Sequence, residues 1–394
     1  MKHLYITLNI GNLNHGAGGW IRTINILKEF KKKNFDFDVL TTKNGKSLLL
    51  KEGLNGLNYI ILENDIFNKL KKNSRLFIFL NWIFLLIIFM IKWKSLNFNK
   101  YKFVYSDSDF FIDIIPNIII SKSQKCYSVC IIHHIVTLNK FKLYSFFYNY
   151  TSYILQRVSF NLIRKFNAIF VYDNYEGKKI KFLFKTKYKF KGKFNMVYNG
   201  IDIKSMKKIK SRNIIKKQNS ILFYGAARRN KGFYDIMDIF NNVLKTNPNA
   251  KLNIAGTMGP KEFFFFSKYI KHHKIEKKIK LSGYLSENKK FREILSNNVI
   301  IFPSYDEGWG IGIMESRFLN KNVVCYNLKS LRDLHKNNIY FIKKGNIKFF
   351  SKKISLLLKN KNNKILNNKY LYKYDWSKCA SRDINFLKYK LLQN

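Results

Sequence analysis

Residues 299–316, "VIIFPSYDEGWGIGIMES", join a strand-like run, a glycine-rich turn and a segment that favours a helix. Residues 299–304, "VIIFPS", are largely apolar and β-branched, and their proline marks the end of what is typically a buried strand. Gly308, Gly310 and Gly312 let the backbone of the turn approach a ligand closely, and free N–H groups at the start of the next helix attract an anion. A strand, a turn and a helix in this order are typical of an α/β fold.

Two glutamates lie in this stretch, Glu307 in the turn and Glu315 one turn into the helix that we expect to begin near Ile311. The dipole of a helix start favours acidic residues, but this accounts for one glutamate rather than for both. Because carboxylates repel a bound phosphate, we expect both side chains to contact neutral hydroxyl groups, which sugars and ribose supply. The stretch therefore predicts a binding site for a nucleotide sugar.

A second glycine turn carries cations. Residues 221–233, "ILFYGAARRNKGF", form a strand-like run and a glycine turn, followed by Arg228, Arg229 and Lys231 before Gly232. Cations at the carboxyl end of a strand can hold a diphosphate and stabilise it as it leaves. Basic residues are frequent throughout this chain, so a solvated charge run is the alternative interpretation.

Two further features follow strand-like runs in the first half of the chain. Gly18 and Gly19, in "NHGAGGWIRTINIL", open an expected helix after the first strand, although a plain tight turn explains such glycines equally well. His133 and His134 end the run "YSVCIIHH" and could contact a substrate hydroxyl, while a histidine at such a place is more often structural.

Strand-like runs alternate with helix-length segments along most of the chain, which predicts βαβ units and largely parallel sheets. The pattern breaks at residues 199–220, which are polar, basic and without periodic apolar positions, so we place the linker between domains there. We predict two Rossmann-like α/β/α domains that face a cleft, residues 1–202 and residues 203–372. Ligands of such domains bind at the carboxyl ends of the strands.

The charge of the chain is unusual, since 73 Lys and Arg stand against 24 Asp and Glu and give a formal net charge of +49 over 394 residues. This balance predicts attraction to polyanions such as nucleic acid, anionic lipid or phosphorylated substrates. The crowding of Lys, Asn, Ile, Phe and Tyr, as in proteins of AT-rich genomes, explains the lysines but not the shortage of acids. The four cysteines lack metal-ligand spacing, and a chain of this size needs no disulfide framework, which favours a reducing cytosol.

Residues Leu76–Ile91, "LFIFLNWIFLLIIFMI", are apolar except for Asn81 and are flanked by basic residues. The segment is shorter than the roughly 20 apolar residues that a membrane span needs. Three interpretations remain open: a helix buried in a core, an interfacial helix whose basic flanks contact anionic lipid, and a spanning helix.

Taken together, these motifs resemble glycosyltransferase family 4, whose members are retaining enzymes with the GT-B fold. The family's two glutamates, separated by seven residues, are matched by Glu307 and Glu315, and its phosphate loop by Gly225, Lys231 and Gly232.

The resemblance extends over nearly the whole chain. The family's N-terminal glycine pair is matched by Gly18 and Gly19, and its "NG-hydrophobic-D" signature by residues 199–202. Residues 373–394 resemble the family's C-terminal helix, which crosses back to the first domain. Ala226 stands where the family usually has an arginine, so Arg228 or Arg229 would have to replace it.

The resemblance implies a role for each matched residue. Glu307 would contact the hydroxyls of the donor sugar and Glu315 those of the ribose. Arg228 and Lys231 would neutralise the diphosphate together with the backbone N–H groups near Ile311 and Gly312. His133, with His134 as the alternative, would lie near the transferred sugar.

The resemblance also implies a function, a hexosyltransferase that uses a nucleotide-diphosphate sugar and needs neither a metal nor another cofactor. The expected acceptor is a glycan or a lipid-linked glycan of cell-surface polysaccharide or glycolipid synthesis. The expected location is the cytoplasm, with peripheral attachment to an anionic inner membrane face left open.

Two rival functions start from the same residues. A glycoside hydrolase or phosphorylase would use Glu307 and Glu315 as its carboxylate pair, but it would not need the surrounding cations and glycines. A nucleic-acid or anionic-surface binding protein would explain the charge, yet no nucleic-acid module is recognisable, and we expect no nucleic-acid partner.

Overall fold

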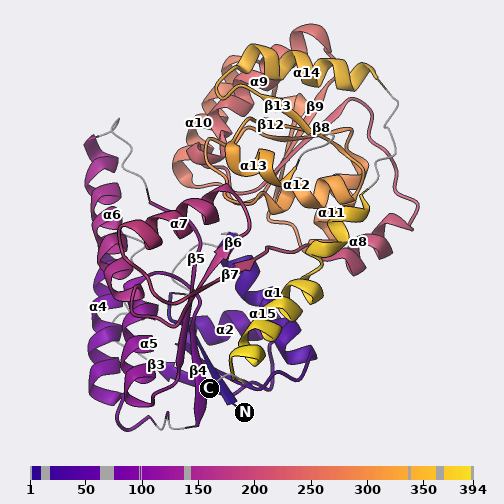
Figure 1. Cartoon of the computed structure of the whole chain (residues 1–394). Coiled ribbons are helices and arrows are strands. Elements are labelled where there is room, and N and C mark those ends of the chain that lie inside the picture. The colour runs from indigo at the N-terminus through magenta and orange to yellow at the C-terminus, as the bar shows by residue number, and fades with distance from the viewer. Residues whose placement is uncertain are drawn as a thin grey trace. The chain divides into compact units, whose positions relative to one another are not determined.

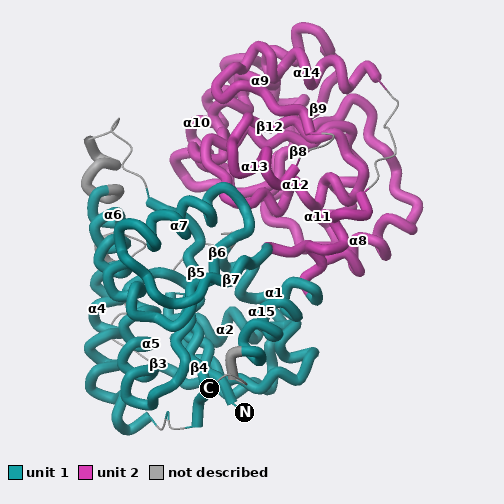
Figure 2. Tube along the Cα trace, viewed as in Figure 1, with its two compact units in different colours: residues 1–198, 377–394 teal, residues 199–376 magenta. Residues whose placement is uncertain are grey.

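The computed structural model describes residues 2–9, 18–62, 75–96, 98, 100–136, 143–335, 339–360 and 368–391. The chain divides into two compact units, which Figure 2 colours separately. Unit 1 comprises Met1–Tyr198 together with Ser377–Asn394, and unit 2 comprises Asn199–Trp376. Each unit is a parallel β-sheet with helices packed against it (Figure 1), so the prediction of two α/β units is confirmed.

The described part of unit 1 contains one parallel sheet with the strand order β3-β2-β1-β4-β5-β6-β7. Its strands are β1 (Lys2–Thr7), β2 (Phe37–Thr42), β3 (Tyr59–Leu62), β4 (Tyr101–Ser106), β5 (Tyr127–Ile132), β6 (Ala168–Tyr172) and β7 (Lys193–Val197). Its helices are α1 (Gly18–Lys32), α2 (Lys43–Lys51), α4 (Arg75–Lys92), α5 (Phe111–Ser123), α6 (Leu143–Ile163), α7 (Tyr175–Thr186) and most of α15 (Trp376–Leu391). Every residue of β6 is buried, because helices cover both faces of a parallel sheet, and such strands are therefore apolar throughout.

The described part of unit 2 contains a second parallel sheet with the order β10-β9-β8-β11-β12-β13. Its strands are β8 (Ser220–Tyr224), β9 (Lys251–Ala255), β10 (Ile279–Gly283), β11 (Val299–Phe302), β12 (Asn322–Tyr326) and β13 (Ile339–Ile342). Its helices are α8 (Ile203–Lys210), α9 (Phe233–Thr246), α10 (Pro260–His272), α11 (Glu287–Ser296), α12 (Ile311–Phe318), α13 (Lys329–Leu334) and α14 (Ile347–Lys359), with 3-10 turns η1 (Arg229–Lys231), η2 (Glu276–Lys278) and η3 (Lys369–Tyr374). The quoted stretch 299–316 is thus β11, a turn and the start of α12, as its sequence predicts.

The segment at residues 199–220 differs from its prediction. It contains α8, in which Ile203, Met206 and Ile209 are buried at a spacing of three residues. The prediction that this segment lacks periodic apolar positions is therefore wrong, because three apolar residues among many lysines suffice to bury one face of a short helix.

The C-terminal helix α15 groups with unit 1 from Ser377 onward. Arg22 on α1 forms a buried ion pair with Asp383 on α15, and it also donates a hydrogen bond to the carbonyl oxygen of Tyr198 at 3.0 Å. The side chain of Arg22 therefore holds both α15 and Tyr198, the last residue of the N-terminal segment of unit 1.

The apolar segment 76–91 lies in α4. Trp82, Leu85 and Phe89 are buried in an apolar cluster of unit 1, whereas Ile87 and Ile91 expose 47% and 75% of their surface. None of the helices that the structure describes is long and apolar enough to cross a bilayer. One face of α4 confirms the core interpretation, and the other face is apolar and exposed.

Candidate active site

The loops after β8 and β11 meet at the carboxyl end of the unit 2 sheet. These two strands are neighbours, and the backbone N–H of Tyr305 donates to the carbonyl of Asn230 at 2.8 Å. Gly232 has a φ of 73°, and a Cβ there would lie 1.9 Å from the carbonyl oxygen of Pro303. Only glycine permits so close a contact, and this contact places the loop with the predicted cations against the loop with the predicted glutamates.

Lys231 and Glu307 form an ion pair at this junction, with 2.5 Å between Nζ and Oε2. The other carboxylate oxygen of Glu307 accepts a hydrogen bond of 3.3 Å from the backbone N–H of Gly310, the N-cap of α12. The carboxylate therefore lies where the free N–H groups of α12 point, and both side chains remain partly exposed, at 31% for Lys231 and 22% for Glu307. The structure brings these two predicted site residues together, and each is the ion-pair partner of the other.

Glu315 lies inside the protein rather than at its surface. Its side chain is 6% exposed and pairs with Lys290 on α11 at 2.7 Å, and the hydroxyl oxygen of Tyr224 lies 3.3 Å from its carboxylate. Burial disfavours the charged form of Lys290, but the carboxylates of Glu315 and Glu287 prevail and raise the pKa of Lys290. Glu315 is thus held as a buried carboxylate with a fixed cation.

The start of α12 is packed closely against the strands. A Cβ on Gly312 would lie 3.0 Å from the ring of Phe302 and 3.1 Å from that of Tyr224, whose hydroxyl donates to the carbonyl of Gly312 at 2.5 Å. Ile311 begins the helix beside it. The predicted backbone donors, Ile311 and Gly312, are therefore the two residues that follow Gly310, whose N–H donates to Glu307.

The two arginines near Lys231 are more exposed than Lys231 itself. Arg228 and Arg229 are exposed, and neither forms an ion pair with an acid in the described part of the chain.

The predicted residues of unit 1 gather around His133, which follows β5. Its Nε2 lies 2.9 Å from the carbonyl oxygen of Asp107, and its Nδ1 lies 2.9 Å from the hydroxyl of Tyr172. Because a carbonyl can only accept, Nε2 carries the proton and Nδ1 accepts from Tyr172. Burial lowers the pKa of His133 to about 4, so the ring is neutral near pH 7.

Gly19 lies against this ring. The helix α1 begins at Gly18, as predicted, and a Cβ on Gly19 would lie 3.3 Å from Nε2 of His133. His134 is exposed and lies outside this contact, and Gly16 of the same motif lies outside the described residues.

The sequence analysis missed Asp107, which follows β4. Its carboxylate accepts hydrogen bonds from Thr23 at 2.5 Å, Tyr5 at 2.6 Å and Thr7 at 3.3 Å. Burial raises the pKa of Asp107 to about 6, although these hydrogen bonds act in the opposite direction. The sequence "FVYSDSD" places Asp107 directly after a strand-like run. His133 was predicted as a site residue because it also follows such a run.

Comparison with known proteins gives one family match. Residues 205–372, most of unit 2, match the model of the glycosyl transferases group 1. No curated protein matches the sequence.

Solved structures of similar architecture cover nearly the whole chain. HepE from Anabaena, in complex with UDP and glucose, has a TM-score of 0.71 at 15% identity over 98% of this chain and 99% of its own. Sucrose-phosphate synthase from Thermosynechococcus elongatus has a TM-score of 0.75 at 11% identity over the whole of both chains. The pneumococcal O-GlcNAc transferase GtfA, in complex with UDP and GlcNAc, has a TM-score of 0.70 at 12% identity over 99% of each chain.

At such identities the structural likeness establishes the fold, which is GT-B. The match of residues 205–372 to the group 1 model adds the class of activity, and the protein is a glycosyltransferase. The hydrolase and nucleic-acid alternatives are thereby set aside.

Proposed function

We propose that the protein is a retaining glycosyltransferase of family 4 that transfers a hexosyl group from a nucleotide-diphosphate sugar to a glycan or a lipid-linked acceptor. The observation that carries the proposal is the pair formed by Lys231 and Glu307 at the N-terminus of α12. A cation, free helix N–H groups and a carboxylate within one small region suit a ligand that has a diphosphate next to a hydroxylated sugar. The complexes of HepE and GtfA with UDP and a sugar support this choice of donor.

Donor binding then requires an exchange of partners. Lys231 leaves Glu307 for the diphosphate, joined by Arg228 or Arg229 and by the N–H groups of Ile311 and Gly312. Glu307 then becomes free to accept hydrogen bonds from the hydroxyls of the donor sugar. Because the pair is partly exposed, its separation is not opposed by the large penalty of leaving buried charges unpaired.

Glu315 keeps Lys290 during this exchange, because the pair is buried. A carboxylate has lone pairs for more than two donors, so Glu315 can accept a ribose hydroxyl while it keeps its contacts with Lys290 and Tyr224. Protein cations supply the positive charge, and we therefore propose a reaction that needs no metal cofactor.

On the acceptor side, His133 would contact the sugar as a neutral hydrogen-bonding group. Its low pKa excludes a role as a cation near pH 7, and both ring nitrogens already have partners. A sugar hydroxyl would therefore replace one of these partners, with the glycines at the start of α1 leaving room beside the ring.

The proposal is tested by a search for the donor. Thermal unfolding is measured with a panel of nucleotide-diphosphate sugars, and the donor should stabilise the protein by about 2.7 kcal/mol at 100 times its dissociation constant. Transfer is then followed by product analysis, and NMR of the product gives its anomeric configuration. Glu307→Ala should abolish transfer and leave the unfolding temperature of the free protein unchanged. Inversion of configuration, or transfer by Glu307→Ala at the wild-type rate, would refute the assignment.

We also propose peripheral attachment to an anionic membrane, where acceptors of cell-surface polysaccharide or glycolipid synthesis are made. The exposed apolar side chains Ile87, Met90 and Ile91 on α4 and the net charge of +49 support it. Replacing these three by serine should reduce flotation with vesicles that contain phosphatidylglycerol. Serine at Phe264, Phe349 and Leu356, exposed apolar residues of unit 2, is the matched control. Equal flotation of both variants and the wild type would count against attachment through α4.

A further inference from the structure

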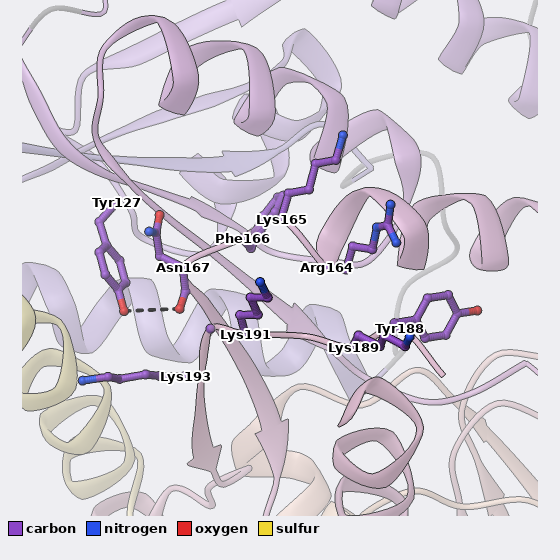
Figure 3. A pocket seen from close by; sticks show the side chains of 10 residues that line it. Tyr127, Arg164, Lys165, Phe166, Asn167, Tyr188, Lys189, Lys191 and Lys193 are labelled. Carbon is purple, nitrogen blue, oxygen red and sulfur yellow. Dashed lines mark hydrogen bonds between the residues drawn. The ribbon is translucent and has the colours of Figure 1, made fainter. Parts of the chain in front are cut away.

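A pocket of about 710 Å³ opens at the edge of the unit 1 sheet opposite to His133. It lies where β5, β6 and β7 begin, whereas His133 follows the end of β5. The residues around it are Tyr127, Arg164, Lys165, Phe166, Asn167, Tyr188, Lys189, Lys191, Gly192 and Lys193, as Figure 3 shows. No part of the proposed donor or acceptor machinery lies in this pocket.

Five of these side chains are cations, contributed by two short loops, and none of the lining residues is acidic. The segment that leads from α7 into β7, residues 187–193, reads "KYKFKGK" and alternates exposed lysines with buried Tyr188 and Phe190. The buried rings anchor the segment while the lysines between them remain exposed, and Lys189 lies in the left-handed region with a φ of 47°. Arg164 and Lys165 follow α6 and supply the opposite rim.

The backbone holds these two loops together. A Cβ on Gly192 would lie 2.6 Å from the carbonyl oxygens of Phe166 and Asn167, so only glycine allows the loops to approach so closely. The N–H of Lys193 donates to the carbonyl of Asn167 at 2.9 Å. The side-chain oxygen of Asn167 in turn accepts from the backbone N–H of Ser128 at 2.8 Å.

The aromatic residues between the lysines complete this frame. Tyr188 packs edge-on against Phe160 and at a tilt against Phe184, both inside the unit. The hydroxyl of Tyr127 donates to the carbonyl of Asn167 at 3.4 Å, the contact drawn in Figure 3. The cations therefore project from a fixed rim and not from a freely moving loop.

The five cations have no acidic counterpart in the part of the chain that the structure describes. None of Arg164, Lys165, Lys189, Lys191 and Lys193 forms an ion pair with an acid among the residues that the structure describes. Elsewhere in the same chain, scarce carboxylates are paired, as with Lys231 and Lys290. Like charges around one pocket repel, and a ligand with several anionic oxygens removes this repulsion.

We propose that this pocket binds phosphate groups. Its volume exceeds that of a single phosphate ion, so it accommodates a phosphate attached to a larger body or two linked phosphates. The phosphate comes either from the headgroup of an anionic lipid or from a soluble phosphate compound. In both cases the lysine and arginine side chains donate hydrogen bonds to the phosphate oxygens.

Lysine footprinting by acetylation and mass spectrometry tests the proposal in the full-length protein at about 0.15 M salt, where surface charges are screened beyond about 8 Å. The probes are inorganic pyrophosphate, vesicles of phosphatidylcholine with phosphatidylglycerol, and vesicles of phosphatidylcholine alone. We expect acetylation of Lys189, Lys191 and Lys193 to fall about fivefold or more with pyrophosphate, with the anionic vesicles, or with both. Protection by pyrophosphate indicates a soluble ligand, and protection by the anionic vesicles alone indicates a lipid headgroup.

A matched pair of variants provides the control. Glutamine at Lys189, Lys191 and Lys193 removes three charges, and glutamine at Lys251, Lys261 and Lys271, exposed lysines of unit 2, removes the same number. The first variant should weaken binding of the protecting probe about tenfold and the second less than twofold. Equal weakening by both, or no selective protection by any probe, would overturn the proposal. Glycosyl transfer to a soluble acceptor should be unchanged in the first variant, so this test does not depend on the proposed function.

Discussion

The carboxyl ends of the two sheets carry different chemistry in the same architecture. In unit 2, lysines and glutamates from separate elements form ion pairs, Lys231 with Glu307 between two loops and Lys290 with Glu315 between two helices. In unit 1, the neutral imidazole of His133 donates a hydrogen bond to a backbone carbonyl and accepts one from the hydroxyl of Tyr172. The buried carboxylate of Asp107 accepts from hydroxyl groups such as that of Thr23. The difference indicates that unit 2 is suited to a charged ligand and unit 1 to a ligand with hydroxyl groups.

Within unit 2 the two ion pairs also differ from each other. The pair at Glu307 is partly exposed, while the pair at Glu315 is almost fully buried. A buried pair that loses one partner leaves an uncompensated charge, and an exposed pair does not. We therefore expect Lys290 to affect stability and Lys231 to affect activity.

The largest expected effect is that of Lys290→Met. Because Glu315 would be left as a buried carboxylate without its cation, the free energy of unfolding should fall by about 3–5 kcal/mol. Chemical denaturation measures this fall. Lys289→Met, an exposed neighbour on the same helix, should cost less than about 0.5 kcal/mol. Adding Glu315→Gln to Lys290→Met should restore part of the stability, and a lack of restoration would show that the pair is not the cause.

The next effect is that of Lys231→Met on the reaction. In the proposed function Lys231 stabilises the leaving diphosphate, so its loss should reduce kcat/KM about 100- to 1000-fold. The unfolding temperature should change little, since the pair with Glu307 is partly exposed. Steady-state kinetics with the identified donor measures the change, with Lys261→Met as the control for loss of a lysine from unit 2. A reduction of less than about threefold would remove Lys231 from the donor site.

A smaller effect is expected from Gly232→Ala, which tests how the two loops of unit 2 are held. The new Cβ would meet the carbonyl of Pro303 in a left-handed conformation, and we expect a loss of about 2–3 kcal/mol. Gly283→Ala is the matched control, because Gly283 also has a positive φ, of 60°, but nothing within 4 Å of its Cβ position. It should lose only about 1–2 kcal/mol. Equal losses in thermal or chemical unfolding would mean that the contact with Pro303 contributes nothing.

The last prediction concerns the pH dependence of unit 1, where the expected change in stability per pH unit is small. Burial raises the pKa of Asp113 to about 8, from an ordinary value near 3.8. The folded state therefore binds a proton that the unfolded state releases, and the stability due to this group is lost as the pH rises from about 4 to about 8. The free energy of unfolding should fall by no more than about 1.4 kcal/mol per pH unit. Asp113→Asn should flatten this pH dependence in unfolding experiments across this range, and an unchanged slope would show that Asp113 is ionised in the folded protein.

Much of the fold could be predicted because its signals are local. Runs such as "VIIFPS" and "AIFVY" contain enough apolar residues to identify buried strands, and both are strands in the structure. The helix α8 was missed because Ile203, Met206 and Ile209 are surrounded by lysines and serine, which hide a buried face of only three residues.

The site could be predicted only in its separate parts. The sequence indicated that Lys231 and Glu307 belong to one site, but not that they pair, because 76 residues separate them. Lys290 had no signal of its own in a chain so rich in lysine, and Asp107 has its Tyr5 partner 102 residues away. Partners brought together by the packing of strands and loops are not encoded in any single stretch of sequence.

The pairing of Arg22 with Asp383 has a consequence for how the protein is made. Unit 1 holds the first 198 residues, yet Arg22 remains a buried cation without its carboxylate until α15 has been synthesised. Unit 2, which is encoded by one continuous segment, has all of its residues available earlier. We therefore expect unit 2 to complete its folding on the ribosome before unit 1, although most of unit 1 is synthesised first. Unit 1 can complete its folding only after α15 has been synthesised.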